Sequence, residues 1–171
     1  MEESALQHSD QAVIVALGSN LAGDFGTTQA LLEAALAAFG PAGLPVRARS
    51  RWWRSAAWPD PIDPPYLNGV AIVETRLGVE QVLAVLHDIE ARFGRLRHVP
   101  NAPRTLDLDL IAYGRTVLEE GGVVVPHPRA AERLFVMGPL AEIAPDWAHP
   151  ALGLTAAELA ARATVGVDAV P

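Results

Sequence analysis

Two aspartates, Asp107 and Asp109, alternate with leucines over residues 106–110. In a β-strand, residues two apart point to the same face, so these carboxylates would project together with their Cα atoms roughly 6–7 Å apart. The leucines would cover the opposite face and anchor the strand in a core. Mg²⁺ takes one or two carboxylates and completes its shell with water and substrate phosphates. The pattern therefore predicts a magnesium site, although a half-buried strand with a solvated acidic face would show the same alternation.

Arginine is the second chemically informative residue type. All thirteen residues counted as Lys or Arg are Arg, and a window without any acidic residue precedes the aspartates and contains Arg92, Arg95, Arg97, His98 and Arg104. The guanidinium group binds phosphate oxygens through paired hydrogen bonds. The absence of lysine excludes a P-loop, which needs a lysine on the phosphates, and Schiff-base chemistry. Any phosphate that this chain handles must be bound by arginine.

Composition excludes several other classes of protein. The chain has 171 residues and no apolar run near the length of about 20 residues that spans a membrane. It has no cysteine, which excludes disulfides, thiolate metal sites and a cysteine nucleophile, and is compatible with the cytoplasm, where we expect the protein. The net charge of −7 argues against a general nucleic-acid binder. Residues 1–11 resemble a flexible tail rather than a signal peptide.

Hydrophobic periodicity predicts the order of the elements. We expect strands at residues 12–18, 45–53 and 67–75 and at the aspartate segment up to residue 113. We expect helices at residues 29–39, 80–93 and 155–162, a hairpin near 117–125, and a helical region at 130–143 interrupted at Gly138-Pro139. This order predicts an α+β, ferredoxin-like split β-α-β core with an antiparallel sheet. Helices would back one face and leave the other open to a ligand, in one domain over residues 12–163 with a frayed tail at 164–171.

Four local patterns occur together along this core. They are Leu17-Gly18-Ser19-Asn20-Leu21, Tyr66-Leu67-Asn68, the segment from Pro103 to Asp109, and Val125-Pro126-His127-Pro128-Arg129 followed by Glu132-Arg133-Leu134-Phe135. With Glu90 before Phe93-Gly94-Arg95 they resemble the 6-hydroxymethyl-7,8-dihydropterin pyrophosphokinase family of folate biosynthesis. The similarity extends from about residue 13 to residue 145.

The resemblance implies transfer of diphosphate from ATP to the pterin hydroxymethyl group with release of AMP, assisted by two Mg²⁺ ions. It implies that Asp107 and Asp109 are the metal ligands and act in catalysis with Arg95 and Arg104. The nucleotide would be contacted by Glu90, Arg95, Arg97, Arg104, His127 and Arg133. Tyr66 and Phe135 would sandwich the pterin ring and Asn68 would bond its edge, and the pocket would be completed by backbone groups of Ser55, Ala56 and Trp58.

The residue types suit this chemistry independently of the resemblance. Attack at a phosphorus needs positioning and neutralisation of charge rather than a covalent enzyme intermediate. A flat heterocycle needs aromatic faces and an amide that both donates and accepts hydrogen bonds. The chain departs from the commonest family pattern at Ala56-Ala57, His87, Asn101 and Ala131. These departures predict a less stiff loop after residue 55 and altered contacts with the nucleotide.

Two other classes share parts of the pattern. A ferredoxin-like module could bind RNA or a regulatory small molecule, but RNA-binding sheets display aromatic residues and a basic field, whereas this strand displays aspartates. A Mg²⁺-dependent nuclease or phosphatase would use the same carboxylates, but it has less need of an aromatic pair. We expect a monomer that acts on ATP and the pterin and binds neither nucleic acid nor membranes.

Overall fold

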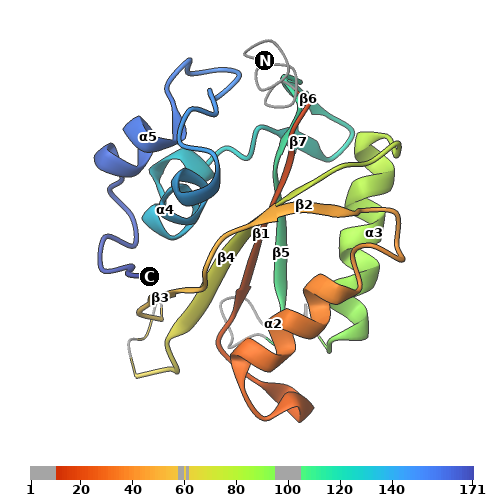
Figure 1. Cartoon of the computed structure of the whole chain (residues 1–171), viewed down its shortest axis with the longest axis vertical. Coiled ribbons are helices and arrows are strands. Elements are labelled where there is room, and N and C mark those ends of the chain that lie inside the picture. Colours follow the sequence, from red (N-terminus) through yellow and green to blue (C-terminus); the bar gives the residue numbers. More distant parts are fainter. Residues whose placement is uncertain (1–10, 58–59, 61, 95–104) are drawn as a thin grey trace.

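A computed structural model describes residues 11–57, 60, 62–94 and 105–171. The elements are, in order, β1 (Val13–Ser19), η1 (Gly23–Phe25), α2 (Thr28–Ala37), β2 (Val46–Arg49), β3 (Trp53–Ser55), β4 (Tyr66–Val73), α3 (Val79–Arg92), β5 (Asp107–Tyr113), β6 (Leu118–Glu120), β7 (Val123–Val125), η2 (Ala130–Glu132), α4 (Leu134–Ile143) and α5 (Ala156–Arg162). Figure 1 shows their arrangement.

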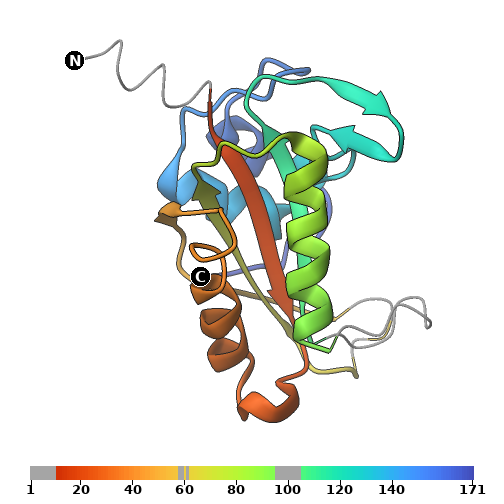
Figure 2. The same ribbon diagram turned by 90° about the vertical axis from the view of Figure 1, so that its right-hand side faces the viewer.

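The main sheet is antiparallel and has the strand order β2-β4-β1-β5, with β3 also pairing with β4. Every residue of the inner strand β1 is buried, which explains its continuous apolar sequence. α2 connects β1 to β2, and α3 connects β4 to β5. This is the split β-α-β arrangement, so the predicted ferredoxin-like fold is confirmed, as is the separate hairpin of β6 and β7, which Figure 2 shows clearly.

Residues 45–53, predicted as one strand, form β2 and β3 instead. The interruption lies at Ser50, whose backbone N–H donates to the Val70 carbonyl oxygen at 2.9 Å. The Ser50 Oγ also accepts a hydrogen bond from the Val70 N–H at 2.9 Å. The serine side chain thus takes the place of a backbone acceptor in the ladder with β4, and the strand is divided there.

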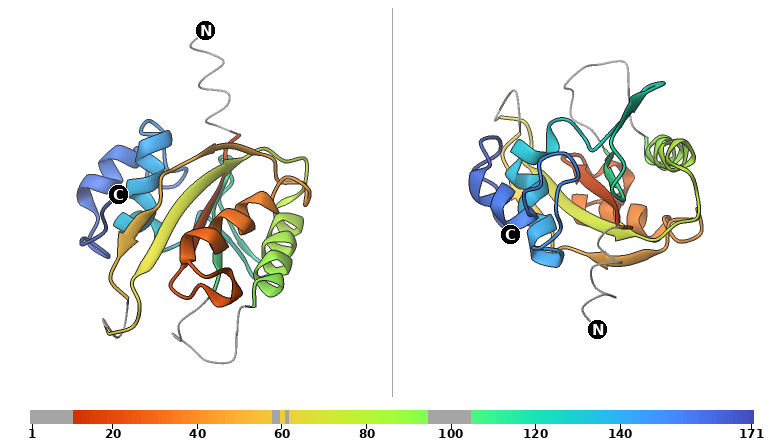
Figure 3. Two further views of the ribbon diagram at one scale, coloured as in Figure 1. Left: turned by 60° about the horizontal axis from the view of Figure 1, so that its bottom comes forward. Right: turned by 90° about the horizontal axis from the view of Figure 1, so that it is seen from above.

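α2 and α3 cover one face of the sheet (Figure 3). Their apolar side chains form a core with inward-facing residues of β1, β4 and β5, including Val15, Leu17 and Leu108. α2 begins after Thr27, whose hydroxyl accepts a hydrogen bond from the Ala30 N–H at 3.0 Å, a capping interaction that satisfies one of the unpaired donors at a helix start. Both helices were predicted to within a few residues at their ends.

The expectation that the opposite face is open is wrong for part of that face. α4 and α5 lie on it (Figure 3), and they form a second apolar core with Ile14, Ala16 and Val70. The next pair of residues on this same face, two positions beyond Ala16 and Val70, is Gly18 of β1 and Asn68 of β4. The helices therefore confine any ligand site on this face to that end of the sheet.

The predicted interruption of the helical region at Gly138-Pro139 is also wrong, because α4 runs through both residues. Proline in a helix lacks the N–H that would bond to the carbonyl four residues earlier. Here residues 136–140 are all buried against the sheet, and tertiary packing contributes more to helix stability than local propensity. Gly138 also allows close approach, since the Trp53 ring occupies the space where a Cβ would lie.

The last residues do not form the frayed tail that the sequence predicts. The backbone N–H groups of Thr164 and Val165 donate to the Glu132 carbonyl oxygen at 3.0 and 2.9 Å. Near the end of the chain, Val170 and Arg54 exchange two backbone hydrogen bonds of 3.0 and 2.7 Å. This segment crosses from the start of α4 to β3, and the C-terminus lies beside β3 in Figure 1. Among the described residues, no helix is long and apolar enough to cross a membrane.

The contact of Gly138 with Trp53 yields a stability prediction. A Cβ at position 138 would lie 2.7 Å from two atoms of the Trp53 ring, whose Nε1 is bound to Glu142 at 2.8 Å. We expect Gly138→Ala to lower the free energy of unfolding by about 1–3 kcal/mol, measured by urea denaturation. The matched control is Gly40→Ala, because nothing lies within 4 Å of a Cβ there. A Gly138 variant as stable as the control would contradict this account of the α4–sheet contact.

Candidate active site

Asp107 and Asp109 project from β5 on the face that also carries α4 and α5. Leu108, between them, is buried in the opposite core with Leu106 and Leu110, while both aspartates are half-buried. The alternation predicted from the sequence is therefore confirmed. It places two carboxylates together near the start of the strand, beyond the part of the sheet that α4 covers.

The cross-strand register places Asn68 on the same face as Asp107. Gly18 of β1 is paired with Asn68 on one side and with Asp107 on the other, and directly paired residues in a sheet point to the same side. Two strand spacings separate Asn68 from Asp107 by about 10 Å. Because Gly18 has no side chain, the row between them has a floor of backbone atoms, and a Cβ there would lie 3.3 Å from Asn68 Oδ1.

Asn68 is itself held in position. It is buried, with 7% of its surface exposed, and its Nδ2 donates to Ser55 Oγ at 2.9 Å. Ser55 is paired with Tyr66 across β3 and β4, so the three side chains belong to one face. With one N–H bound to Ser55, the amide retains a second N–H and its oxygen, which suits the donor–acceptor edge of a heterocycle.

His127 and Arg133 lie on the Asp107 side of the floor. The His127 N–H donates to the Ile111 carbonyl oxygen on β5 at 2.8 Å, and its Nδ1 accepts from the Arg129 N–H at 3.1 Å. Burial lowers the pKa of His127 below the ordinary 6.5, and the charges of Arg133 and Arg129 lower it further, while Asp107 acts in the opposite direction. A neutral imidazole with Nδ1 engaged carries its proton on Nε2, where it can donate to an anion.

Phe135 follows Arg133 at the start of α4 and is half-buried. The Arg133 guanidinium carbon lies 5.7 Å from the centre of the Phe135 ring, within the range of a cation–π interaction. One short segment thus carries an aromatic ring and a cation side by side. Their predicted contacts with a heterocycle and a phosphate stay predictions.

Glu90, which is predicted to contact the nucleotide, makes a contact with the backbone of β5. Its side chain is fully buried between α3 and β5, and its Oε2 accepts a hydrogen bond from the Leu108 N–H at 3.1 Å. The residue it binds lies between Asp107 and Asp109. Glu90 therefore acts on the site by fixing the strand that bears the aspartates, because a buried carboxylate is stabilised by such charge-assisted bonds.

Four predicted site residues lie outside the described residues: Trp58, Arg95, Arg97 and Arg104. Ala56 is described, and its side chain is exposed while its N–H donates to Asp168 Oδ2 at 2.7 Å. Asp168 and the floor residue Gly18 were both missed as site residues. Gly18 belongs to a motif that the sequence analysis singled out, but no local signal distinguishes Asp168 from any other exposed aspartate.

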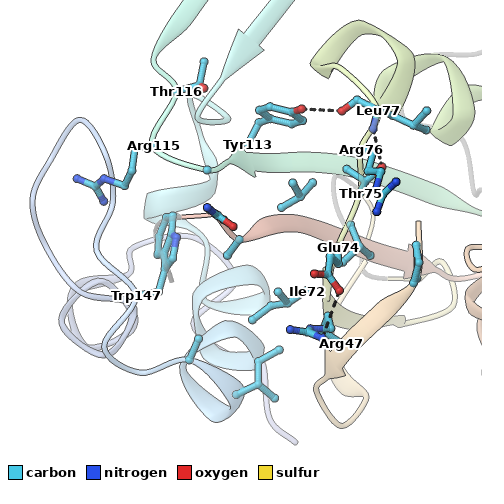
Figure 4. A pocket seen from close by; sticks show the side chains of 18 of the residues that line it. Arg47, Ile72, Glu74, Thr75, Arg76, Leu77, Tyr113, Arg115, Thr116 and Trp147 are labelled. Atoms are coloured by element: carbon cyan, nitrogen blue, oxygen red, sulfur yellow. Dashed lines mark hydrogen bonds and ion pairs between the residues drawn. The ribbon is translucent and has the colours of Figure 1, made fainter. Parts of the chain in front are cut away.

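A large hollow of about 1600 Å³ lies at the opposite end of the sheet (Figure 4). Several of its polar groups are engaged with one another: Arg47 pairs with Glu74 at 3.2 Å, and the Tyr113 hydroxyl donates to the Leu77 carbonyl oxygen at 2.6 Å. The described residues that line it include none of the predicted site residues. The size of this hollow therefore does not make it the candidate active site.

The donor set at the aspartates suits magnesium bound together with a phosphate ligand. Among the described residues, no group of three or more His, Cys, Asp or Glu side chains could form a closed metal site. Mg²⁺ commonly uses only one or two carboxylates and takes its remaining ligands from water and phosphates. Asp107 and Asp109 meet that requirement, with His127 and Arg133 available for the phosphate oxygens.

The electrostatics of His127 can be tested directly. We expect its NMR titration midpoint to lie below 6.5, because the folded site disfavours the imidazolium form. Because folding lowers the pKa of His127, the contribution of its neutral form to the stability of the fold is present above pH 6.5 and is lost as the pH falls toward the folded-state pKa. Arg133→Gln should raise the midpoint by removing a repelling charge, whereas Arg162→Gln on α5 is the control and should leave it unchanged. A midpoint at or above 6.5 would contradict the arrangement.

Comparisons with known proteins show which family the chain resembles. The family model of 7,8-dihydro-6-hydroxymethylpterin-pyrophosphokinase (HPPK) matches residues 14–145. The 2-amino-4-hydroxy-6-hydroxymethyldihydropteridine pyrophosphokinase of Synechocystis sp. is 43% identical over 147 residues, which cover 85% of this chain and 73% of that protein. The protein of the same name from Pseudomonas aeruginosa is 39% identical over 143 residues, 82% of this chain and 85% of that protein.

A solved structure shows the same fold at low sequence identity. HPPK-DHPS of Plasmodium falciparum superposes with a TM-score of 0.67 at 13% identity, and the match covers 88% of this chain. The chain spans 44% of the length of that longer protein. The family model covers most of the chain and the two bacterial relatives match over most of their own length. The chain therefore belongs to the 7,8-dihydro-6-hydroxymethylpterin-pyrophosphokinase family.

Proposed function

We propose that this chain transfers diphosphate from ATP to the hydroxymethyl group of 6-hydroxymethyl-7,8-dihydropterin, releasing AMP, in folate biosynthesis. The observation that supports this most strongly is the row formed by Asn68, Gly18 and Asp107, in a chain of this family. The row offers an amide at one end, a carboxylate at the other, and between them a glycine that adds no side chain.

The pterin would lie at the Asn68 end. Its polar edge would bond to the Asn68 amide, which Ser55 already orients, and its faces would contact Tyr66 and Phe135. The hydroxymethyl group would then point along the floor toward Asp107. A side chain at Gly18 would obstruct this path, which gives a physical reason for glycine there. Trp58 would contribute to the same pocket.

The ATP phosphates would lie at the Asp107 end. Arg133 and the Nε2–H of His127 would bind phosphate oxygens, and Arg95, Arg97 and Arg104 would add further guanidinium groups from the segment before β5. Asp107 and Asp109 would hold two magnesium ions between the carboxylates and the phosphates. Bound there, the metal would neutralise charge on the phosphate oxygens and align the phosphates for displacement.

The reaction needs positioning more than a reactive side chain. The hydroxymethyl oxygen attacks the β-phosphorus, the bond from that phosphorus to the oxygen bridging to the α-phosphate breaks, and AMP leaves. The hydroxyl proton is released to the solvent. Charge spreads over phosphate oxygens in such a transition state, so fixed cations and aligned reactants lower the barrier. The residues around the floor supply both.

One experiment separates this function from the alternatives. The chain is incubated with ATP, Mg²⁺ and the reduced pterin, and the nucleotide products are resolved by chromatography. Pterin-dependent formation of AMP with a pterin diphosphate supports the proposal. Formation of ADP or inorganic phosphate would instead favour a phosphohydrolase, and no turnover would favour a binding module.

The aspartates should be essential for turnover but not for folding. We expect Asp107→Ala or Asp109→Ala to reduce AMP formation by on the order of 10³-fold, as for loss of a group that stabilises transition-state charge. The thermal midpoint should change little, because both side chains are half-buried outside the two apolar cores. Glu119→Ala, an exposed carboxylate on β6, is the control. Near-normal AMP formation by either aspartate variant would remove the metal assignment.

Asn68 should act selectively on the pterin. We expect Asn68→Ala to weaken pterin binding by about 10- to 100-fold, because a desolvated polar edge loses its partner, with little change in ATP affinity. Ser55→Ala removes the group that orients Asn68 but keeps the amide, so its loss should be smaller. Isothermal titration with each substrate measures both effects. Equal losses for ATP and pterin would argue for a merely structural role of Asn68.

A further inference from the structure

Residues 164–170 connect two walls of the proposed pterin pocket. At one end the segment is bound to the residues that begin α4, where Phe135 lies, and at the other it is bound to β3, which ends at Ser55. The family model stops at residue 145. The segment therefore lies outside the part of the chain from which the proposed function was argued.

The contact at the first wall is close. The Leu134 N–H donates to the Val165 carbonyl oxygen at 2.9 Å, which ties the segment to the first residue of α4. Gly166 has a φ of 65°, a conformation that favours glycine. A Cβ at this position would lie well inside van der Waals contact with the Phe135 ring. The ring thus packs directly on the Gly166 backbone, which restricts its position.

The contact at the second wall uses a charge. Asp168 Oδ2 accepts a hydrogen bond from the Ala56 N–H at 2.7 Å, a short charge-assisted bond. Ala56 follows Ser55, whose hydroxyl orients Asn68. The paired backbone bonds between Arg54 and Val170 flank this contact. The carboxylate therefore fixes the first loop residue after the strand that supports the pterin-recognising amide.

We propose that Asp168 is a positioning residue for the pterin site. By holding the Ala56 N–H while the same segment supports Phe135, it fixes the distance between the loop wall and the aromatic wall. This inference rests on the proposed function. Asp168 does not itself contact the substrate in this proposal. We expect its effect at the pterin end, because its side chain binds Ala56 and the segment that carries it packs on Phe135.

Two variants of Asp168 test the role. Asp168→Ala removes the acceptor, and we expect the KM and Kd for 6-hydroxymethyl-7,8-dihydropterin to rise about tenfold, with less than a twofold change in the KM for ATP. Asp168→Asn keeps an oxygen that can accept from Ala56, so it should restore pterin affinity to within about threefold of the original chain. Asp146→Ala, which removes an exposed carboxylate before α5, is the control and should change neither constant.

A positioning role differs from ordinary stabilisation because loss of Asp168 should weaken pterin binding and leave ATP binding almost unchanged. A lower thermal midpoint with unchanged pterin affinity would overturn the proposal. Equal losses for pterin and ATP, or failure of Asp168→Asn to restore pterin affinity, would overturn it as well.

If Asp168→Ala does not fold, Asp168→Glu replaces it, since a longer side chain displaces the acceptor while keeping the charge. That variant should also weaken pterin binding selectively, and unchanged pterin binding would overturn the proposal. All effects are measured relative to the original chain. If the original chain itself makes no AMP, the proposed function is refuted, which is a different outcome from any of those that overturn the role of Asp168.

Discussion

The pairing of β1 with β4 and β5 is the constraint on which the rest of the site depends. Side chains in a sheet alternate with a period of two, so a slip of β5 by one residue would place Asp107 and Asp109 in the core beneath α2 and α3. That arrangement would bury two carboxylates and expose Leu108, which is unfavourable on both counts. The apolar alternation that forms the core therefore also fixes which face carries the chemistry.

The outer side of β5 is closed by groups that belong to the same site. An edge strand exposes backbone donors and acceptors that need partners. Glu90 accepts the Leu108 N–H from α3, and the His127 N–H donates to the Ile111 carbonyl oxygen from the segment after β7. Both residues resemble nucleotide contacts in sequence, yet each also holds the strand that bears the aspartates. In the proposed function His127 would therefore both support the strand and bind a phosphate oxygen.

Sequence patterns predicted what depends on neighbouring residues and missed what depends on distant ones. Alternation within β5 was sufficient to place Asp107 and Asp109 on one face, and local periodicity was sufficient to locate α2 and α3. The continuation of α4 through Pro139 was missed because burial against the sheet outweighs a local break. The docking of residues 164–170 was missed because most of its bonds involve backbone groups, which leave no pattern in the side chains.

Ala56 shows how such distant contacts can change the consequence of a local departure. The sequence alone predicts a less stiff loop at Ala56-Ala57, since alanine leaves φ free where proline would fix it. Alanine, however, keeps the backbone N–H that proline lacks, and Asp168 binds that group from the far end of the chain. The stiffness that a proline ring would supply does not depend on the rest of the fold. The bond from Ala56 to Asp168 is present only while residues 164–170 are docked, so in this chain the position of Ala56 is thermodynamically linked to the docking of that segment.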